Sequence, residues 1–124
     1  MDVTPLIPKG HQLIEAYGGG SFKVSGQQYG GSILVFAEHT ECWPVADWSR
    51  VEADDFKKIL QAEPLPEIVI VGCGERFEMV PKSIKQLFRH YAIPVEAMDT
   101  GAACRTYNIL LGEGRRVIAA MIAV

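Results

Sequence analysis

The spacing of hydrophobic positions along the chain changes character near residue 50. Before that point, short apolar segments are separated by glycines, a pattern typical of strands joined by tight turns. The pair Ser25-Gly26 between two such segments predicts a hairpin turn. Pro44 confines the last of these strands to the edge of a sheet, because proline cannot donate to a strand ladder. The expected strands are residues 13–17, 22–24, 32–36 and 42–45.

After residue 50 the apolar positions follow a helical period that alternates with short apolar runs. Phe56, Ile59 and Leu60 recur at i, i+3 and i+4, which indicates one buried helical face. Residues 68–71 are apolar without interruption, as in a strand that is buried on both faces. The expected helices are residues 53–62, 82–92 and 100–111, and the expected strands are 68–71, 95–98 and 117–122.

Strands that alternate with helices after an antiparallel region predict an α/β fold. We expect a three-layer arrangement in which helices cover a mixed central β-sheet and an N-terminal β-hairpin extends it. The length of 124 residues suits one domain over residues 1–124. Residues 68–71 are expected to form a central strand of the sheet.

Composition and charge narrow the classes of function. Hydrophobic residues make up 48% of the chain and the formal net charge is −3, which together argue against disorder. The chain also lacks the positive excess that binding to phosphate backbones requires, so we expect no nucleic-acid partner. Lys82, Lys85 and Arg89 form a basic stripe, which is either the solvated side of a helix or a docking surface for an acidic partner.

Cysteines and apolar runs bear on the compartment. The three cysteines, Cys42, Cys73 and Cys104, show no paired spacing, which favours a reducing compartment over a disulfide framework. The longest apolar run, residues 117–124, is too short to span a membrane. The first 20 residues resemble neither a signal peptide nor a transit peptide, so we expect a cytoplasmic protein without a transmembrane segment.

Two loops that follow predicted strands hold the candidate ligand-binding residues. The first, residues 72–77, lacks the third glycine of a dinucleotide fingerprint, because Phe77 takes that place. In open α/β sheets, however, ligands bind at the carboxyl ends of the strands, and the second loop also begins a helix whose free N–H groups attract anions. In the alternative interpretation, Asp99 or Thr100 only caps that helix. The candidate residues are Gly72, Gly74, Arg76, Thr100, Gly101, Ala102, Cys104 and Arg105.

No catalytic or metal site can be assembled from the sequence. A thiol in a first helical turn, such as that of Cys104, can be reactive, but the sequence places no base beside it, and inert packing is the favoured interpretation. His39 and Glu41 match the H-x-E of zinc deaminases, yet the P-C-x-x-C that accompanies it is missing. We therefore expect no catalytic residue, no metal and no cofactor.

Residues 99–110, together with residues 68–76 upstream, are the most distinctive part of the chain. With shorter segments nearer the N-terminus, they give nearly the whole chain a resemblance to a small domain-of-unknown-function family. That family includes the mitochondrial NADH dehydrogenase (complex I) assembly factor 3 and the adipogenesis-associated protein. The resemblance implies a three-layer α/β fold with a mixed central sheet, no established enzyme activity, and, for the mitochondrial member, assembly of complex I through contacts with other proteins. The matching segments are residues 99–110, 113–115, 119–120 and 68–76, with 14–17, 22–26 and Trp43 nearer the N-terminus.

Two classes of function follow from these observations. The first is a non-enzymatic interaction or assembly module that binds protein partners, with contact to a membrane-associated complex as one form of it. The alternative is a small-anion-binding protein, or an enzyme, that uses the crevice near Thr100 and Cys104. The module requires an exposed apolar patch for its partner, whereas the enzyme requires a concave pocket with convergent polar groups.

Overall fold

A computed structural model describes residues 10–124. The first nine residues, on which part of the targeting interpretation rests, lie outside the described residues. The chain forms two sheets, with strand orders β1-β2-β3 and β5-β4-β8-β6-β7. The strands are β1 (Ile14–Gly18), β2 (Ser21–Val24), β3 (Gln27–Gly30), β4 (Ile33–Val35), β5 (Thr40–Cys42), β6 (Ile68–Gly72), β7 (Val95–Met98) and β8 (Val117–Met121). The helices are η1 (Trp48–Arg50), η2 (Ala53–Phe56), α1 (Lys57–Leu60), α2 (Lys82–His90) and α3 (Thr100–Gly112), where η marks a 3₁₀ turn.

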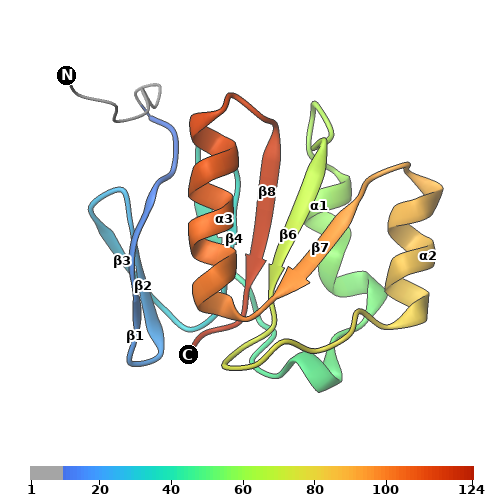
Figure 1. Cartoon of the computed structure of the whole chain (residues 1–124), viewed down its shortest axis with the longest axis horizontal. Helices are drawn as coiled ribbons and strands as arrows, with labels where there is room; N and C mark the ends of the chain where they lie inside the picture. The colour runs from blue at the N-terminus through green and yellow to red at the C-terminus, as the bar shows by residue number, and fades with distance from the viewer. Residues whose placement is uncertain (1–9) are drawn as a thin grey trace.

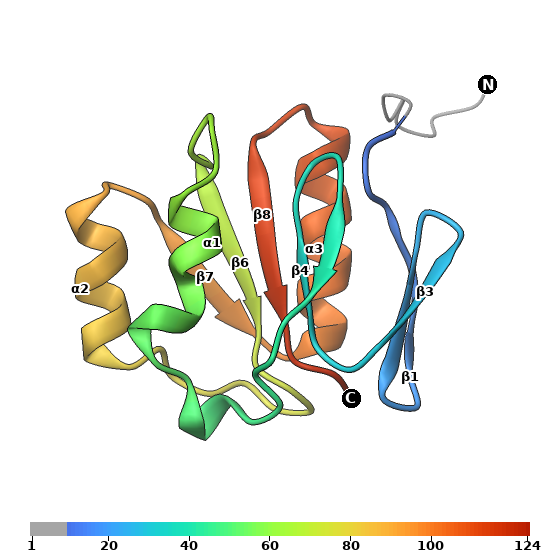
Figure 2. The same cartoon turned by 180° about the vertical axis from the view of Figure 1, so that it is seen from behind.

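The five-stranded sheet is mixed and forms the middle of three layers, which confirms the predicted architecture. Strands β6, β7 and β8 are parallel, while β4 runs antiparallel to β8 and to β5. Helix α3 lies over one face (Figure 1), and α1 lies over the other, as the view from behind shows (Figure 2). Strand β6 pairs with β8 on one side and with β7 on the other, so residues 68–71 form an interior strand of the sheet, as predicted, next to the middle strand β8.

Successive side chains along the strands point to opposite faces of the sheet, so the core forms two clusters, one on each face. Val69 and Val71 of β6 belong to the cluster beneath α1 and α2, whereas Ile70 belongs to the cluster beneath α3. The first cluster is rich in aromatic rings, because Phe56 meets Trp43, Trp48 and Phe88 in edge-to-face contacts. The second cluster includes Phe22 and Tyr107. Side chains therefore fill both spaces between the layers.

Strands β1, β2 and β3 form the predicted N-terminal antiparallel region, as a sheet of its own beside the main sheet. Two side chains of α3 hold β1 in place. Asn108 Oδ1 accepts from Ile14 N at 3.0 Å, and Asn108 Nδ2 donates to Ile14 O at 2.8 Å. Tyr107 Oη donates to Gln12 O at 2.9 Å. An amide side chain on the helix thus pairs with the strand backbone as a neighbouring strand would.

Three expected elements differ in detail. The expected edge strand at 42–45 is β5 at Thr40–Cys42, because Trp43 leaves the strand to bury its ring and to donate to Asp55 O at 2.8 Å. The expected helix at 53–62 is η2 followed by one turn of α1. Strand β3 has no counterpart among the expectations. Among residues 10–124, no helix is both long and apolar enough to cross a membrane.

Candidate functional site

The two loops with the predicted ligand-binding residues lie side by side. They follow β6 and β7, which are neighbouring parallel strands with Gly72 opposite Met98. Three hydrogen bonds join the loops: Cys73 N donates to Met98 O at 2.9 Å, Thr100 N donates to Gly74 O at 2.8 Å, and Gly74 N donates to Thr100 Oγ1 at 3.0 Å. The two loops therefore lie side by side, and the polar groups of Gly74 and Thr100 join them.

Thr100 is buried where a ligand was expected to reach it. The residue has no exposed surface, and Oγ1 also donates to Ile122 O at 2.7 Å. A Cβ on Gly72 would lie 2.9 Å from Thr100 Oγ1 and 3.0 Å from Thr100 Cα, so only glycine lets the strand approach the helix this closely. Gly72 and Thr100 therefore pack closely where β6, α3 and the chain after β8 meet, and leave no space between them.

The amino end of α3 is capped from within the protein. Asp99 Oδ1 accepts from Ala102 N at 2.9 Å, as an N-cap does. Gly101 lies against the hydroxyl of Tyr17, which a Cβ at this position would strike. An anion at Thr100, Gly101 and Ala102 would have to approach beside the Asp99 carboxylate and past Tyr17. Anion binding at this end stays a prediction.

The two candidate arginines extend from the surface. Arg76 and Arg105 are both exposed, and neither takes part in an ion pair among the described residues. Arg105 borders a cavity of about 390 Å³ between β1 and α3, which Glu15, Cys104 and Asn108 also line. Arg105 thus lies beside β1, and no described contact brings Arg76 to it.

Cys104 is buried in the core beneath α3, where only 3% of its surface is exposed. Burial raises the pKa of its thiol to about 12; the charge of Arg105 opposes this rise and that of Asp99 adds to it. Burial also raises the pKa of Cys73. Because the thiolate is the nucleophile, both groups are unreactive thiols at neutral pH. This arrangement supports packing as the role of Cys104.

We expect a thiol-specific probe at pH 7 to label Cys104 far more slowly in the native protein than in the unfolded chain. The raised pKa lowers its thiolate fraction roughly a thousandfold, and packing blocks access to the sulfur. Cys42 is exposed and serves as the internal control that reacts readily. Peptide mapping by mass separates the sites. Labelling of Cys104 as fast as Cys42 would restore the case for a reactive thiolate.

A larger cavity, of about 920 Å³, lies at the opposite edge of the sheet. It opens where β6 and β8 begin, between the β4–β5 turn, the end of α1 and the last turn of α3. Phe36, Leu111 and Ile118 are buried residues that contribute its apolar lining. Nothing in the sequence indicates this cavity, because four separate segments of the chain form its walls.

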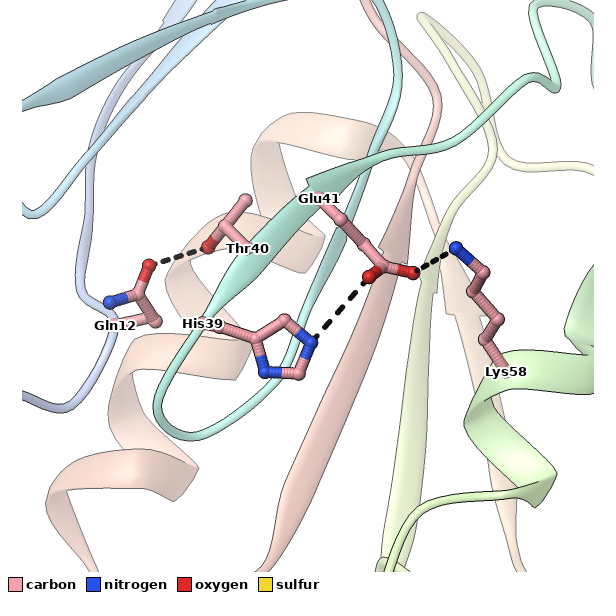
Figure 3. A network of polar contacts seen from close by, with 5 residues as sticks. All are labelled: Gln12, His39, Thr40, Glu41 and Lys58. Atoms are coloured by element: carbon pink, nitrogen blue, oxygen red, sulfur yellow. Dashed lines mark hydrogen bonds and ion pairs between the residues drawn. The ribbon is translucent and has the colours of Figure 1, made fainter.

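A carboxylate with two basic neighbours lies in one wall of this cavity (Figure 3). Lys58 Nζ lies 3.1 Å from Glu41 Oε1, and His39 Nε2 lies 3.6 Å from Glu41 Oε2. The imidazole of His39 stacks on Phe36 with ring centroids 4.3 Å apart. Next to them, Thr40 Oγ1 donates to Gln12 Oε1 at 2.7 Å. The closeness of His39 and Glu41 is visible in the sequence, whereas the contact with Lys58 arises only from the fold.

The described part of the chain contains no set of side chains that could bind a metal ion. Across residues 10–124, histidine, cysteine, aspartate and glutamate side chains form no group of three that could hold an ion. His39 and Glu41 therefore stand without the further ligands that a zinc site requires.

Known proteins match nearly the whole described chain. The human NADH dehydrogenase [ubiquinone] 1 alpha subcomplex assembly factor 3 is 34% identical over 109 residues, and the match covers 88% of this chain and 59% of the human protein. The chain thus spans about three fifths of the length of that relative. An uncharacterised protein of Rhodobacter capsulatus is 30% identical over 88% of this chain and 82% of its own length.

Solved structures share the fold. A protein from Bartonella henselae, described as an outer membrane protein, superposes with a TM-score of 0.86 at 29% identity, covering 96% of this chain and 99% of that one. A Bordetella pertussis protein described as a Mth938-like domain has a TM-score of 0.81 at 28% identity, covering 98% and 92%. The sequence profile of the family described as protein of unknown function (DUF498/DUF598) matches residues 14–122. The chain therefore belongs to the DUF498/DUF598 family.

Proposed function

We propose that the protein is a non-enzymatic interaction module that assists the assembly of a multisubunit complex of the NADH dehydrogenase kind. The observation that carries this proposal is the 34% identity with the human assembly factor over 88% of the chain. The proposal includes a cytoplasmic location, which the three free cysteines support, since free thiols persist in reducing compartments.

The predicted crevice supports a non-enzymatic role. Thr100 uses its hydroxyl within the protein, Asp99 caps the helix, and Cys104 is held as a thiol by burial. Nucleophilic catalysis requires an activated nucleophile beside a base, and these three groups provide neither.

An exposed apolar pair supplies a surface for a protein partner. Phe77 and Met79 lie in the segment between β6 and α2, with 61% and 73% of their surfaces exposed. The backbone between them and α2 is held in place, because Trp48 Nε1 donates to Met79 O at 3.1 Å. Two large apolar side chains on an anchored backbone suit a surface that a partner covers.

The test is affinity capture from native cells with the wild type and with the double variant Phe77→Ser, Met79→Ser. The wild type is expected to retain subunits or assembly proteins of an NADH dehydrogenase, identified by mass. The double variant is expected to retain them at least about tenfold less, because burying two large apolar side chains stabilises a complex by more than this factor.

A matched control comes from α3. Ile109 is also 61% exposed, and Ile109→Ser changes an apolar surface residue elsewhere on the protein. This variant is expected to retain the partners at the wild-type level. Capture that is equal for all three proteins would contradict the role of the Phe77–Met79 surface, and capture of no such subunit by the wild type would contradict the proposed function.

A further inference from the structure

The 920 Å³ cavity has the dimensions of a small-molecule site. Such sites measure about 300–1,000 Å³ and combine apolar walls with a few placed polar groups. Here Phe36, Leu111, Val117 and Ile118 are buried residues that line the cavity. The apolar part of a ligand would rest against them.

Two polar atoms at this cavity lack hydrogen-bond partners. Among residues 10–124, the buried side-chain nitrogen and oxygen atoms without a partner in the protein are His11 Nδ1 and Glu41 Oε1, and both residues line the cavity. Lys58 Nζ lies 3.1 Å from Glu41 Oε1 as an ion pair, but without the alignment of a hydrogen bond. Because buried polar atoms nearly always make a hydrogen bond, two such atoms without one at the same cavity indicate a ligand that supplies the missing groups.

The missing groups are donors. A carboxylate only accepts hydrogen bonds, and the Nδ1 of a neutral histidine accepts when Nε2 carries the proton. A carboxylate with an unmatched lone pair favours a charged donor over a neutral one, since charge-assisted hydrogen bonds are about twice as strong.

The charges around the cavity also favour a cation. Arg115 Nε lies 3.5 Å from Glu67 Oε2 as an ion pair, whereas Arg116 Nε donates to the neutral carbonyl of Leu65 at 3.3 Å. Three further carboxylates line the cavity and form no ion pair among the described residues: Glu38, Glu63 and Glu113. These three carboxylates outnumber the guanidinium of Arg116, which also forms no ion pair among the described residues, so the unmatched charge around the cavity is negative on balance.

We propose that this cavity binds a small organic molecule that carries a protonated amino group on an apolar body. The amino group donates to Glu41 Oε1 and the apolar body lies against Phe36 and Ile118. Lys58 then competes with the ligand, because its own ammonium group occupies the space beside Glu41 in the empty protein. Its side chain is 65% exposed, so it can move into solvent when the ligand enters.

Three probes with one apolar body test the proposal: 3-phenylpropan-1-amine, 3-phenylpropan-1-ol and 3-phenylpropanoate. Backbone amide shifts are followed while each is titrated into the wild-type protein. The amine is expected to shift residues around His11, His39 and Glu41, and to bind about tenfold more tightly than the alcohol. The propanoate is expected to bind more weakly than either.

Two variants are expected to change amine binding in opposite directions. Glu41→Gln removes the charged acceptor and is expected to weaken binding about tenfold. Lys58→Gln removes the competing cation and is expected to tighten binding several-fold. Because Lys58 is exposed, its replacement leaves the fold intact, and this arm remains decisive even where Glu41→Gln disturbs the wall. Glu75→Gln, a change to an exposed carboxylate after β6, is the matched control and is expected to have no effect.

The remaining outcomes overturn the proposal. Equal binding of amine and alcohol would show an apolar cavity without a role for Glu41. Tighter binding of the propanoate would show an anion site instead, and weaker amine binding in Lys58→Gln would show that Lys58 does not compete with the amine for Glu41. Absence of shifts at millimolar amine would show that the cavity holds solvent only. Loss of binding in Glu75→Gln would show attraction by net charge rather than by this cavity.

Discussion

Replacing Phe56 by alanine is expected to lower the free energy of unfolding by about 3–5 kcal/mol. The ring has no exposed surface, and its centroid lies 5.6 Å from that of Trp43, 6.3 Å from Trp48 and 5.3 Å from Phe88. Removing it forfeits the transfer free energy of a phenyl group and leaves a cavity that three large rings cannot fill. Small domains are stable by only about 5–15 kcal/mol, so the loss is a large part of the total.

Urea denaturation followed by tryptophan fluorescence measures this loss, because Trp43 and Trp48 both contact Phe56. Phe56→Leu is the control: leucine retains much of the volume and is expected to cost clearly less. An alanine variant that loses less than about 1 kcal/mol would contradict a central role for Phe56 in this cluster.

The second large effect is expected from Thr100→Val, which should lower the free energy of unfolding by about 2–6 kcal/mol. Valine keeps the shape of threonine but removes Oγ1. Gly74 N then loses its acceptor at 3.0 Å, and Ile122 O loses its donor at 2.7 Å. Both backbone groups stay buried without a partner, and each costs about 1–3 kcal/mol.

Thr100→Ser separates the hydroxyl from the methyl group. Serine keeps both hydrogen bonds and loses one buried methyl, for an expected cost of about 1 kcal/mol. Thermal and urea denaturation of the two variants give the comparison. If valine is tolerated better than serine, the methyl contact rather than the hydroxyl joins the two loops, and the interpretation of Thr100 is wrong.

The architecture was predictable because burial on both faces leaves a clear pattern. Residues 68–71 are apolar throughout, since alternate side chains enter different clusters, and this run marks β6 as an interior strand. Strand β3 was not predicted, because Gln27 and Gln28 are both exposed and no alternation of apolar and polar residues identifies the strand. The expected helix at 53–62 is partly a 3₁₀ turn. The sequence could not reveal this, because Phe56 and Ile59 share a face in either helix type and their spacing does not distinguish the two.

The candidate site was less predictable than the fold. The proximity of the two loops follows from strand order, but the filling of the space between them depends on Thr100, Asp99 and Tyr17. The Asp99 cap is local, and the sequence already offered it as one interpretation of this helix end. Neighbouring residues do not reveal the contacts of Thr100 with Ile122 and of Gly101 with Tyr17, because these cross a large distance along the chain. The cavity at Glu41 has the same origin, since its walls come from segments between His11 and Ile118.

The position of β8 between β4 and β6 has a consequence for synthesis on the ribosome. Ile33 of β4 pairs with Met121, and Ile68 of β6 pairs with Val117. Strands β4 and β6 therefore have no partner in common until residues 117–121 leave the exit tunnel. Until then their apolar faces and unpaired backbone edges are open to other chains. Translation must run through β8 before the main sheet closes, so the nascent protein is most exposed to aggregation and to chaperones in the interval just before that strand emerges.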